Sequence, residues 1–437
     1  MRDLVLLVIG TVIGSGIFLV PGAVLRPVGN SIAIAMTVWL TGGVLSLLGA
    51  LTYGELSAIR PEAGGLYIFI RDTFGRPLAF LYGWTLFFVI SSGSIATLAV
   101  AFSNYFSEFV PLSPWLAKLV SVLMIAIIAV VNVRGTRQSA DLQNITSAIK
   151  VAAIVVMSAV LLWSGKNPIL SSPVTNAAGN TGSLLSGFGL AMISVLWAYE
   201  GWQYATFSAG ETVNPQRNFP RAFLIGSAAL IGIYLFANLG YLAAIGPNSV
   251  AGSNRVAVTA VGAVIGPKAA KLVGLIILIS IFSAANSIIL TAPRVYYAMA
   301  NDGLFFKRLS EVHPRFGTPA FAVISAAIWA AVLAASGTFE QLLTYVIFIG
   351  WIFYALAAAS IFVYRKRAPD ASRPYRVPGY PYTPIVFIVA AMALVVNTIV
   401  TQPGRSAVGL GIVGLGIPAY VVWSRMAKRN NLEATTK

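Results

Sequence analysis

The chain has 437 residues, 58% of them hydrophobic and only 10% charged, with a net charge of +16 and a mean hydropathy of +0.83. Because soluble domains carry about a quarter charged residues, this composition excludes an ordinary soluble fold and predicts a membrane domain. The absence of cysteine excludes a disulfide-linked partner and thiolate sites. The single histidine, His313, excludes a di-histidine metal site and a Ser-His-Asp catalytic triad. We therefore expect no metal and no cofactor.

Twelve apolar runs follow one another along the chain, separated by short polar or Pro/Gly-rich connections. A spanning helix needs about 20 mostly apolar residues, and each run approaches or exceeds that length. The expected spans are residues 3–25, 32–58, 77–106, 115–133, 142–164, 184–211, 220–246, 267–300, 318–337, 341–364, 382–401 and 406–424. The prediction is an all-α, polytopic protein whose residues 1–437 form a single transmembrane domain. We expect the first run to be a span and not a cleaved signal peptide.

The basic residues are distributed unequally between the two sides of this arrangement. Of the 29 Lys and Arg residues, 20 fall on the side of the two termini and 7 on the other side. By the positive-inside rule, we expect both termini to be cytoplasmic in a multi-pass protein of the plasma membrane. The lipid bilayer then accounts for the net charge, and no nucleic-acid partner is needed. The remaining two, Lys150 and Arg294, fall inside spans, and Arg294 lies near enough to a span end to snorkel.

Two spans carry glycines where a membrane helix should be continuous. The first span contains Gly14-Ser15-Gly16, and the sixth contains Trp197-Ala-Tyr-Glu-Gly-Trp202. Small residues also allow close helix packing, but a Gly-Ser-Gly triplet disrupts a helix more than packing requires. At about 1.5 Å per residue, Gly14 and Glu200 lie roughly 16 Å, and Lys150 roughly 13 Å, from the cytoplasmic ends of their spans. All three therefore lie near the middle of a hydrocarbon layer about 30 Å thick.

The two breaks occupy corresponding places if the chain contains two five-span repeats. Residues 1–164 would form the first repeat, residues 184–364 the second and inverted one, and residues 382–424 two further helices. Interrupted helices in matching positions of inverted halves indicate the binding site of a transporter.

A pair of such breaks is suited to an α-amino acid. The second half of a broken helix exposes N–H groups with partial positive charge, and the first half exposes carbonyls with partial negative charge. We expect a substrate carboxylate on the N–H groups of Ser15, Gly16 and Ile17. Its ammonium would meet the carbonyls of residues 196–198. A branched side chain at Gly16 should then block binding in a protein that still folds.

Several motifs in these places and elsewhere resemble the amino acid–polyamine–organocation (APC) superfamily, and within it the L-type amino acid transporter (LAT) branch and its bacterial serine/threonine and alanine-serine exchangers. The motifs are GTVIGSGIF at 10–18, YGEL at 53–56, AGGLY at 63–67, WAYEGW at 197–202, GETVNPQRNFPRA at 210–222, PR at 293–294 with NDG at 301–303, and RPYRVPGYP at 373–381. The resemblance covers nearly the whole chain and implies two inverted five-helix repeats that work by alternating access.

The resemblance also implies which residues bind and control the substrate. The implied substrate contacts are Val12, Gly14, Ser15, Gly16, Trp197, Ala198 and Glu200. Trp197 stands at the position of an aromatic gate, and its large indole should favour small neutral L-amino acids such as alanine, serine or threonine. In sodium-coupled relatives a sodium ion lies between spans one and eight, and the ammonium of Lys150 would replace it.

Three polar residues within spans allow more than one interpretation. Lys150 could be a structural ion pair, a snorkelling chain, a tethered cation that removes the need for sodium, or a proton switch. Glu200 could carry a proton, pair with Lys150, or bind free N–H groups of the break. Ser283 on span eight could line the site or satisfy freed backbone groups.

The predicted function is sodium-independent exchange of small neutral L-amino acids, with no enzymatic activity. A channel would show a filter of repeated loops, and a membrane enzyme would need clustered His, Cys or paired carboxylates. Neither pattern occurs in the sequence. The alternative left open is a proton-coupled symporter, including one for other neutral or cationic amino acids.

Overall fold

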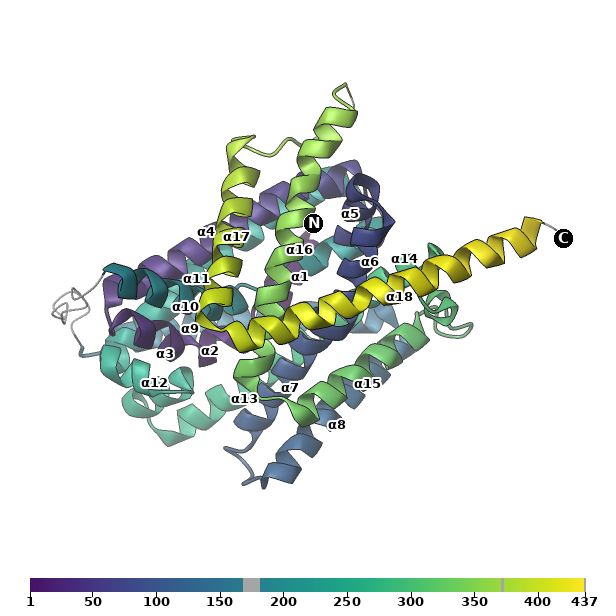
Figure 1. The fold of residues 1–437 in the computed structure, drawn as a ribbon. Coiled ribbons are helices and arrows are strands. Elements are labelled where there is room, and N and C mark those ends of the chain that lie inside the picture. Colours follow the sequence, from purple (N-terminus) through teal and green to yellow (C-terminus); the bar gives the residue numbers. More distant parts are fainter. Residues whose placement is uncertain (168–180, 371–372, 436–437) are drawn as a thin grey trace.

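Helices joined by short turns make up the computed structural model, which describes residues 1–167, 181–370 and 373–435 (Figure 1). The α-helices are α1 (Arg2–Val12), α2 (Gly16–Leu19), α3 (Pro21–Leu25), α4 (Ile32–Ile59), α5 (Leu66–Phe74), α6 (Arg76–Thr85), α7 (Ser91–Phe106), α8 (Pro114–Arg134), α9 (Thr136–Ser164), α10 (Thr181–Ala198), α11 (Pro215–Gly252), α12 (Val256–Val264), α13 (Pro267–Thr291), α14 (Pro293–Asn301), α15 (Ala320–Ser336), α16 (Phe339–Arg367), α17 (Tyr382–Thr401) and α18 (Pro403–Thr435). Shorter turns of helix are η1 (Arg26–Val28), the π-helical η2 (Leu86–Ile90), η3 (Trp202–Glu211) and η4 (Lys307–Ser310).

In the described part of the chain, 11 helical segments are long and apolar enough to cross a membrane, and Ala320–Ser336 is a shorter apolar helix. Together they confirm the predicted all-α, twelve-span membrane fold. An even number of crossings returns the chain to the face on which it began. We call this face, which holds both termini, the terminal face, and the opposite one the distal face.

The helix ends differ from the expected spans at two places. The first span ends at Leu19 instead of residue 25, because Val20 turns the chain and Pro21 begins a separate helix, α3. The seventh extends to Gly252 but bends at Gly246, whose φ of +73° is not helical. Most of the expected distal loop 166–180, and residues 371–372 of the terminal loop 366–373, lie outside the described residues.

Large apolar side chains cover the outside of the bundle. Trp163 is 93% exposed, and Leu185 and Val400 are each 75% exposed. The C-terminal helix α18, yellow in Figure 1, runs along the outside of the bundle and carries further exposed apolar residues. Such a surface is stable only against lipid, which supports a multi-pass membrane protein.

The two interrupted spans lie inside the bundle. The first span packs through α1 against α9, α11 and α13, and the sixth packs through α10 against α4, α16 and α17. Glycines allow the two spans to approach each other closely. A Cβ on Gly16 would lie 2.5 Å from the Cα of Ala198, and a Cβ on Gly201 would lie 2.8 Å from the carbonyl oxygen of Thr11. Gly201 also has a φ of +128°, which favours glycine.

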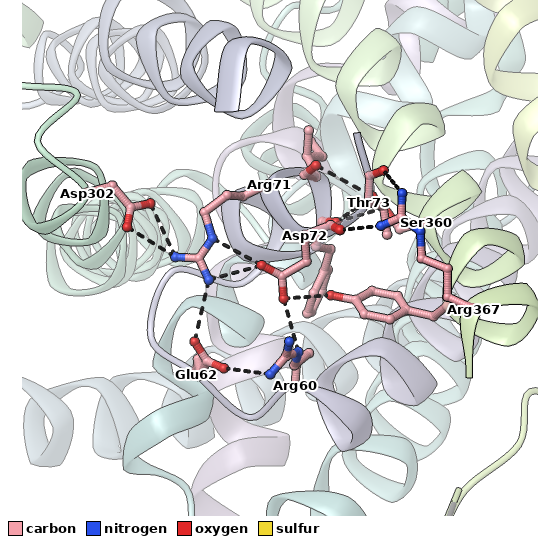
Figure 2. Close-up of polar contacts among 11 residues, drawn as sticks. Arg60, Glu62, Arg71, Asp72, Thr73, Asp302, Ser360 and Arg367 are labelled. Atoms are coloured by element: carbon pink, nitrogen blue, oxygen red, sulfur yellow. Dashed lines mark hydrogen bonds and ion pairs between the residues drawn. The ribbon is translucent and has the colours of Figure 1, made fainter. Parts of the chain in front are cut away.

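A network of charges fastens α5 to the terminal ends of two spans (Figure 2). The Arg71 guanidinium donates to both carboxylate oxygens of Asp302, at 3.3 and 3.2 Å, and lies 3.0 Å from Asp72. Burial opposes the charge of Arg71, but the carboxylates of Asp302 and Asp72 outweigh it and raise the pKa of Arg71. Arg367 at the end of α16 donates to the carbonyl oxygens of Asp72 and Thr73. The loop after α4 is thereby connected to the ends of both α14 and α16.

A buried carboxylate, Glu55, fixes the loop between spans ten and eleven. Its side chain is 0% exposed and accepts two hydrogen bonds from Arg365, at 2.9 and 2.7 Å, and one from the backbone N–H of Val377 at 2.6 Å. Arg365 also lies 3.6 Å from the ring centre of Tyr380. Two motifs noted in the sequence, YGEL and RPYRVPGYP, therefore meet at this carboxylate.

Candidate functional site

The first span is interrupted between Val12 and Gly16. The helix α1 ends with Ile13 in an extended conformation, φ −72° and ψ 94°, and α2 begins at Gly16. The N–H groups of Ser15, Gly16 and Ile17 have no hydrogen-bond acceptor in the described part of the chain. They are the free donors that the start of a helix leaves unpaired, and they are available to an anion.

The sixth span is interrupted over Tyr199–Gly201, between α10 and η3. Its freed carbonyls are partly satisfied within the protein: Tyr234 donates its hydroxyl to the Ala198 carbonyl at 2.9 Å, and the Glu200 N–H donates to the Trp197 carbonyl at 3.1 Å. Both breaks predicted from the glycines are therefore present. Of the three carbonyls expected to bind a substrate ammonium, those of Trp197 and Ala198 already accept hydrogen bonds, which a substrate would have to share or replace.

The two breaks face a very small cavity. Its volume is about 20 Å³, room for about one water molecule, whereas ligand pockets usually measure about 300–1,000 Å³. Its walls are formed by Thr11, Val12, Gly14, Ser15, Gly16, Ser94, Leu98, Trp197, Glu200, Gly201, Tyr204, Ala284 and Ile288. Trp197 lies over the break of the first span and directs its Nε1 donor toward Ser15 Oγ at 3.4 Å. The structure therefore shows the central cavity closed.

Most of the predicted contact residues gather around this cavity. Val12, Gly14, Ser15, Gly16, Trp197 and Glu200 line it, but Ile17 and Ala198 do not. Ile17 is completely buried behind the break, and Ala198 packs against Gly16. The buried Ile17 can therefore contribute only its backbone N–H as a donor to a substrate carboxylate.

Lys150 lies behind the break of the first span, with 0% of its surface exposed. Its Nζ donates to the carbonyl oxygens of Gly10 at 2.5 Å and Ile13 at 2.7 Å, and to Ser283 Oγ at 3.3 Å. These acceptors belong to α1 and α13, so one ammonium connects the first, fifth and eighth spans. The geometry contradicts a snorkelling chain and an ion pair, because all the described partners are neutral and lie at the break.

Ser283 and Ser280 complete the environment of the break from α13. Ser283 accepts from Lys150 and donates to Gln143 Oε1 at 3.1 Å, and it shares a 2.8 Å contact with Thr146. Ser280 approaches the Gly14 carbonyl at 3.2 Å. Ser283 does not line the central cavity, and the described partners of its hydroxyl are side chains, so it supports the break through Lys150, whereas Ser280 is the serine that meets freed carbonyls.

Glu200 belongs to a separate polar cluster between η3 and α16. One carboxylate oxygen accepts from Gln203 Nε2 at 2.5 Å and from the Tyr354 hydroxyl at 2.6 Å. Within the described part of the chain these donors are neutral, and neither is Lys150 or a free backbone N–H group. The interpretations of Glu200 as partner of Lys150 or as acceptor for the break are therefore wrong.

Several residues that shape the site were not predicted from the sequence. Tyr234, Gln203 and Tyr354 lie outside the two glycine breaks, although each hydrogen-bonds a residue in or directly beside the break of the sixth span. The only feature that could have pointed to Tyr234 or Tyr354 is a tyrosine within an apolar span, and many other buried tyrosines of this chain share that feature.

Each face of the protein has a vestibule larger than the central cavity. The distal one has a volume of about 510 Å³. It is separated from the central cavity by Trp197 and Phe339, whose rings meet edge-on with centroids 6.2 Å apart. The terminal one has a volume of about 420 Å³ and is lined by Glu211 and Arg294, which form two hydrogen bonds of 2.6 and 2.7 Å. Arg294 therefore does not snorkel toward the lipid surface, since it pairs with a carboxylate.

A twelve-span bundle with two broken spans around a central cavity, and a vestibule on either face, defines a membrane transporter. The chain belongs to the family described as amino acid permease, whose sequence profile matches residues 1–422.

Named relatives of the chain include exchangers and transporters. The serine/threonine exchanger SteT of Bacillus subtilis is 32% identical over 95% of this chain and 94% of its own length. The human cystine/glutamate transporter is 30% identical, over 96% of this chain and 84% of its own length. The human large neutral amino acids transporter small subunit 2 is also 30% identical, over 97% of this chain and 80% of its own length. All three are described as transporters or exchangers and none as an enzyme.

Proposed function

We propose that this protein is a sodium-independent exchanger of small neutral L-amino acids, such as alanine, serine or threonine, that works by alternating access. The observation that carries the proposal is the meeting of the two breaks at one cavity, with three unpaired N–H groups at Ser15, Gly16 and Ile17. An amino acid carboxylate fits such donors without a basic side chain. The relation to SteT favours serine and threonine, although the named relatives differ in substrate.

The size of the substrate is limited by Trp197. Its indole forms part of the cavity wall and contacts Phe339. When these two rings move apart, the bulk of the indole leaves limited room for the side chain of a bound amino acid. Two small residues, Gly14 and Ala284, lie next to each other in the cavity wall. We therefore propose Trp197 as both gate and size filter, with Val12, Ser15, Gly16 and Ala198 around the substrate's backbone atoms.

Sodium independence is inferred from Lys150. Its ammonium is held by oxygen atoms of α1 and α13, an arrangement that also suits a hard cation. A permanently tethered cation at this place removes the need for a dissociable one. Ser283 supports this arrangement as a positioning residue.

Alternating access is inferred from the pair of vestibules. On the distal face Trp197 and Phe339 close the path to the cavity, and on the terminal face Glu211 pairs with Arg294. We propose residues 1–164 and 184–364 as two inverted repeats, one carrying each broken span, with residues 382–424 as additional helices. Opening one contact while the other stays closed would carry an amino acid across.

Counterflow in proteoliposomes tests the proposed exchange. Vesicles loaded with unlabelled serine should take up labelled serine, threonine or alanine far faster than empty vesicles, and replacing sodium with choline should change the rate little. A larger amino acid such as tryptophan should not exchange, because Trp197 restricts the cavity. The absence of counterflow with every amino acid of a broad panel would contradict the proposal.

A proton-coupled symporter is the second candidate, and Glu200 is the observation in its favour. This carboxyl group lines the cavity, is 8% exposed, and has only neutral described partners. If Glu200 carries a proton, an inward proton gradient should drive accumulation into empty vesicles, and Glu200→Gln should abolish accumulation but leave exchange intact. Exchange without gradient-driven accumulation favours the exchanger.

The proposed orientation places both termini in the cytoplasm of a cell whose plasma membrane holds the protein. It rests on the excess of Lys and Arg on the terminal face. The partners we propose are the substrate and the lipid, and a further subunit would not be linked by a disulfide because the chain has no cysteine.

Labelling of single cysteines checks this orientation, because the wild-type chain provides an unreactive background. We expect cysteines at 166–180 to react with an impermeant maleimide added outside intact cells. Those at 213–218 and 366–373 should react only after the membrane is opened. Reversed accessibility would place the termini outside.

A further inference from the structure

The distal vestibule is a cavity in its own right. Its volume of about 510 Å³ lies within the range of small-molecule sites, whereas the closed central cavity measures about 20 Å³. Phe339 lines the vestibule and contacts Trp197, which lines the central cavity. A molecule in the vestibule would therefore rest against Phe339, one of the two rings that separate it from the central cavity.

One cation and one anion of this vestibule lie close together. Arg405 donates to Thr344 Oγ1 and to Gln402 Oε1, both at 3.1 Å, and both acceptors are neutral. Glu340 precedes Thr344 by four residues on α16, so the two share a helix face. Its side chain is exposed and has no basic partner in the described part of the chain. The vestibule thus presents a guanidinium at Thr344 and a carboxylate on the residue one helical turn before it.

The other two arginines of the vestibule give it an excess of positive charge. Arg26 donates to the carbonyl oxygen of Ala251 at 2.7 Å, a neutral acceptor. Arg255 forms an ion pair with Glu108 and is neutralised. Arg26, Arg405 and Glu340 therefore remain without a partner of opposite charge in the described part of the chain. The net positive charge attracts the carboxylate of a ligand, and Glu340 can bind its ammonium.

We propose that the distal vestibule binds the zwitterionic head group of α-amino acids before they enter the central cavity. The carboxylate lies on Arg405, whose planar guanidinium suits it, and the ammonium lies on Glu340. When Phe339 and Trp197 separate, the bound amino acid passes to the N–H groups of the first span. The inference rests on an amino acid substrate, as proposed above, but adds a site that exchange through the central cavity does not require.

The vestibule site can be probed without measuring transport. Ser194 lines the vestibule one turn before Trp197, and Ser194→Cys creates the only thiol of the chain. L-alanine outside should slow labelling of the introduced cysteine by an impermeant maleimide, about threefold at twice its dissociation constant. With Arg405→Gln added, about fivefold more alanine should be needed, the effect of removing one exposed charge contact. The matched control is Lys268→Gln, which removes an exposed distal-face cation outside the vestibule and should change nothing.

A third variant separates the vestibule from the central cavity. Gly14→Val fills the central cavity, so protection by alanine should persist in a Gly14→Val, Ser194→Cys protein. Three results would each overturn the vestibule site: alanine fails to protect the Gly14→Val, Ser194→Cys protein, it protects the Arg405→Gln protein at the same concentration as the parent, or it protects no variant at all. Failure of the proposed exchange looks different: alanine would still protect the introduced cysteine, but wild-type vesicles would show no counterflow.

Discussion

Lys150→Ala is expected to lower exchange by about tenfold to a hundredfold, while the protein still inserts in the membrane. The ammonium satisfies the carbonyls of Gly10 and Ile13, and leaving buried acceptors unpaired costs about 1–3 kcal/mol each. Since those carbonyls belong to the break of the first span, the loss should distort the N–H groups proposed for the substrate carboxylate. Lys150→Arg should restore little, because a planar fork does not fit a site built for a point charge.

The measurement is counterflow with substrate titrated separately on each side of the vesicle membrane. The expected result is a raised KM on at least one side, with wild-type transport indifferent to sodium. Lys271→Ala is a matched control, because it removes a lysine from the exposed surface of α13. Unchanged KM values on both sides would leave Lys150 only a structural role. A wild-type requirement for sodium would contradict the idea that its ammonium replaces that ion.

Depth in the membrane was predictable from the sequence, and this is why the site was found. A spanning helix advances by a nearly fixed rise per residue, so Gly14, Lys150 and Glu200 could be placed near one level. The structure brings Gly14 and Glu200 to the same cavity and Lys150 directly behind it. The break glycines were visible because they act locally on the helix that contains them.

Rotation about each helix axis was not predictable, and the errors arise there. Ile17 and Ala198 were expected beside the substrate, whereas the structure buries the Ile17 side chain and packs Ala198 against Gly16, so neither lines the cavity. Contacts between distant segments were equally hidden. Glu200 meets Tyr354 across 154 positions, and Lys150 reaches Ser283 across 133. Such pairings depend on tertiary packing, which cannot be deduced from a single sequence.

Gly14→Val is expected to reduce counterflow to about 1% of the wild-type rate or less with little loss of folded protein. A Cβ at Gly14 would lie 3.1 Å from Ala284 Cβ and 3.1 Å from Leu98 Cδ2, two side chains that line the central cavity. The added branches would therefore occupy a cavity that holds only about 20 Å³ when closed. A loss of about 2.7 kcal/mol of binding corresponds to a hundredfold. Gly14→Ala should give an intermediate rate.

Gly16→Val is the informative comparison, because the structure corrects the expectation that it would simply block binding. A Cβ there would lie 2.5 Å from the Cα of Ala198, a backbone atom that cannot move aside, so α2 and α10 would be forced apart. Thermal melting of the purified variants should show a clear loss of stability for Gly16→Val and a small one for Gly14→Val. Near-normal counterflow in Gly14→Val would place the substrate elsewhere, whereas loss of counterflow with only that small loss of stability assigns this cavity to the substrate.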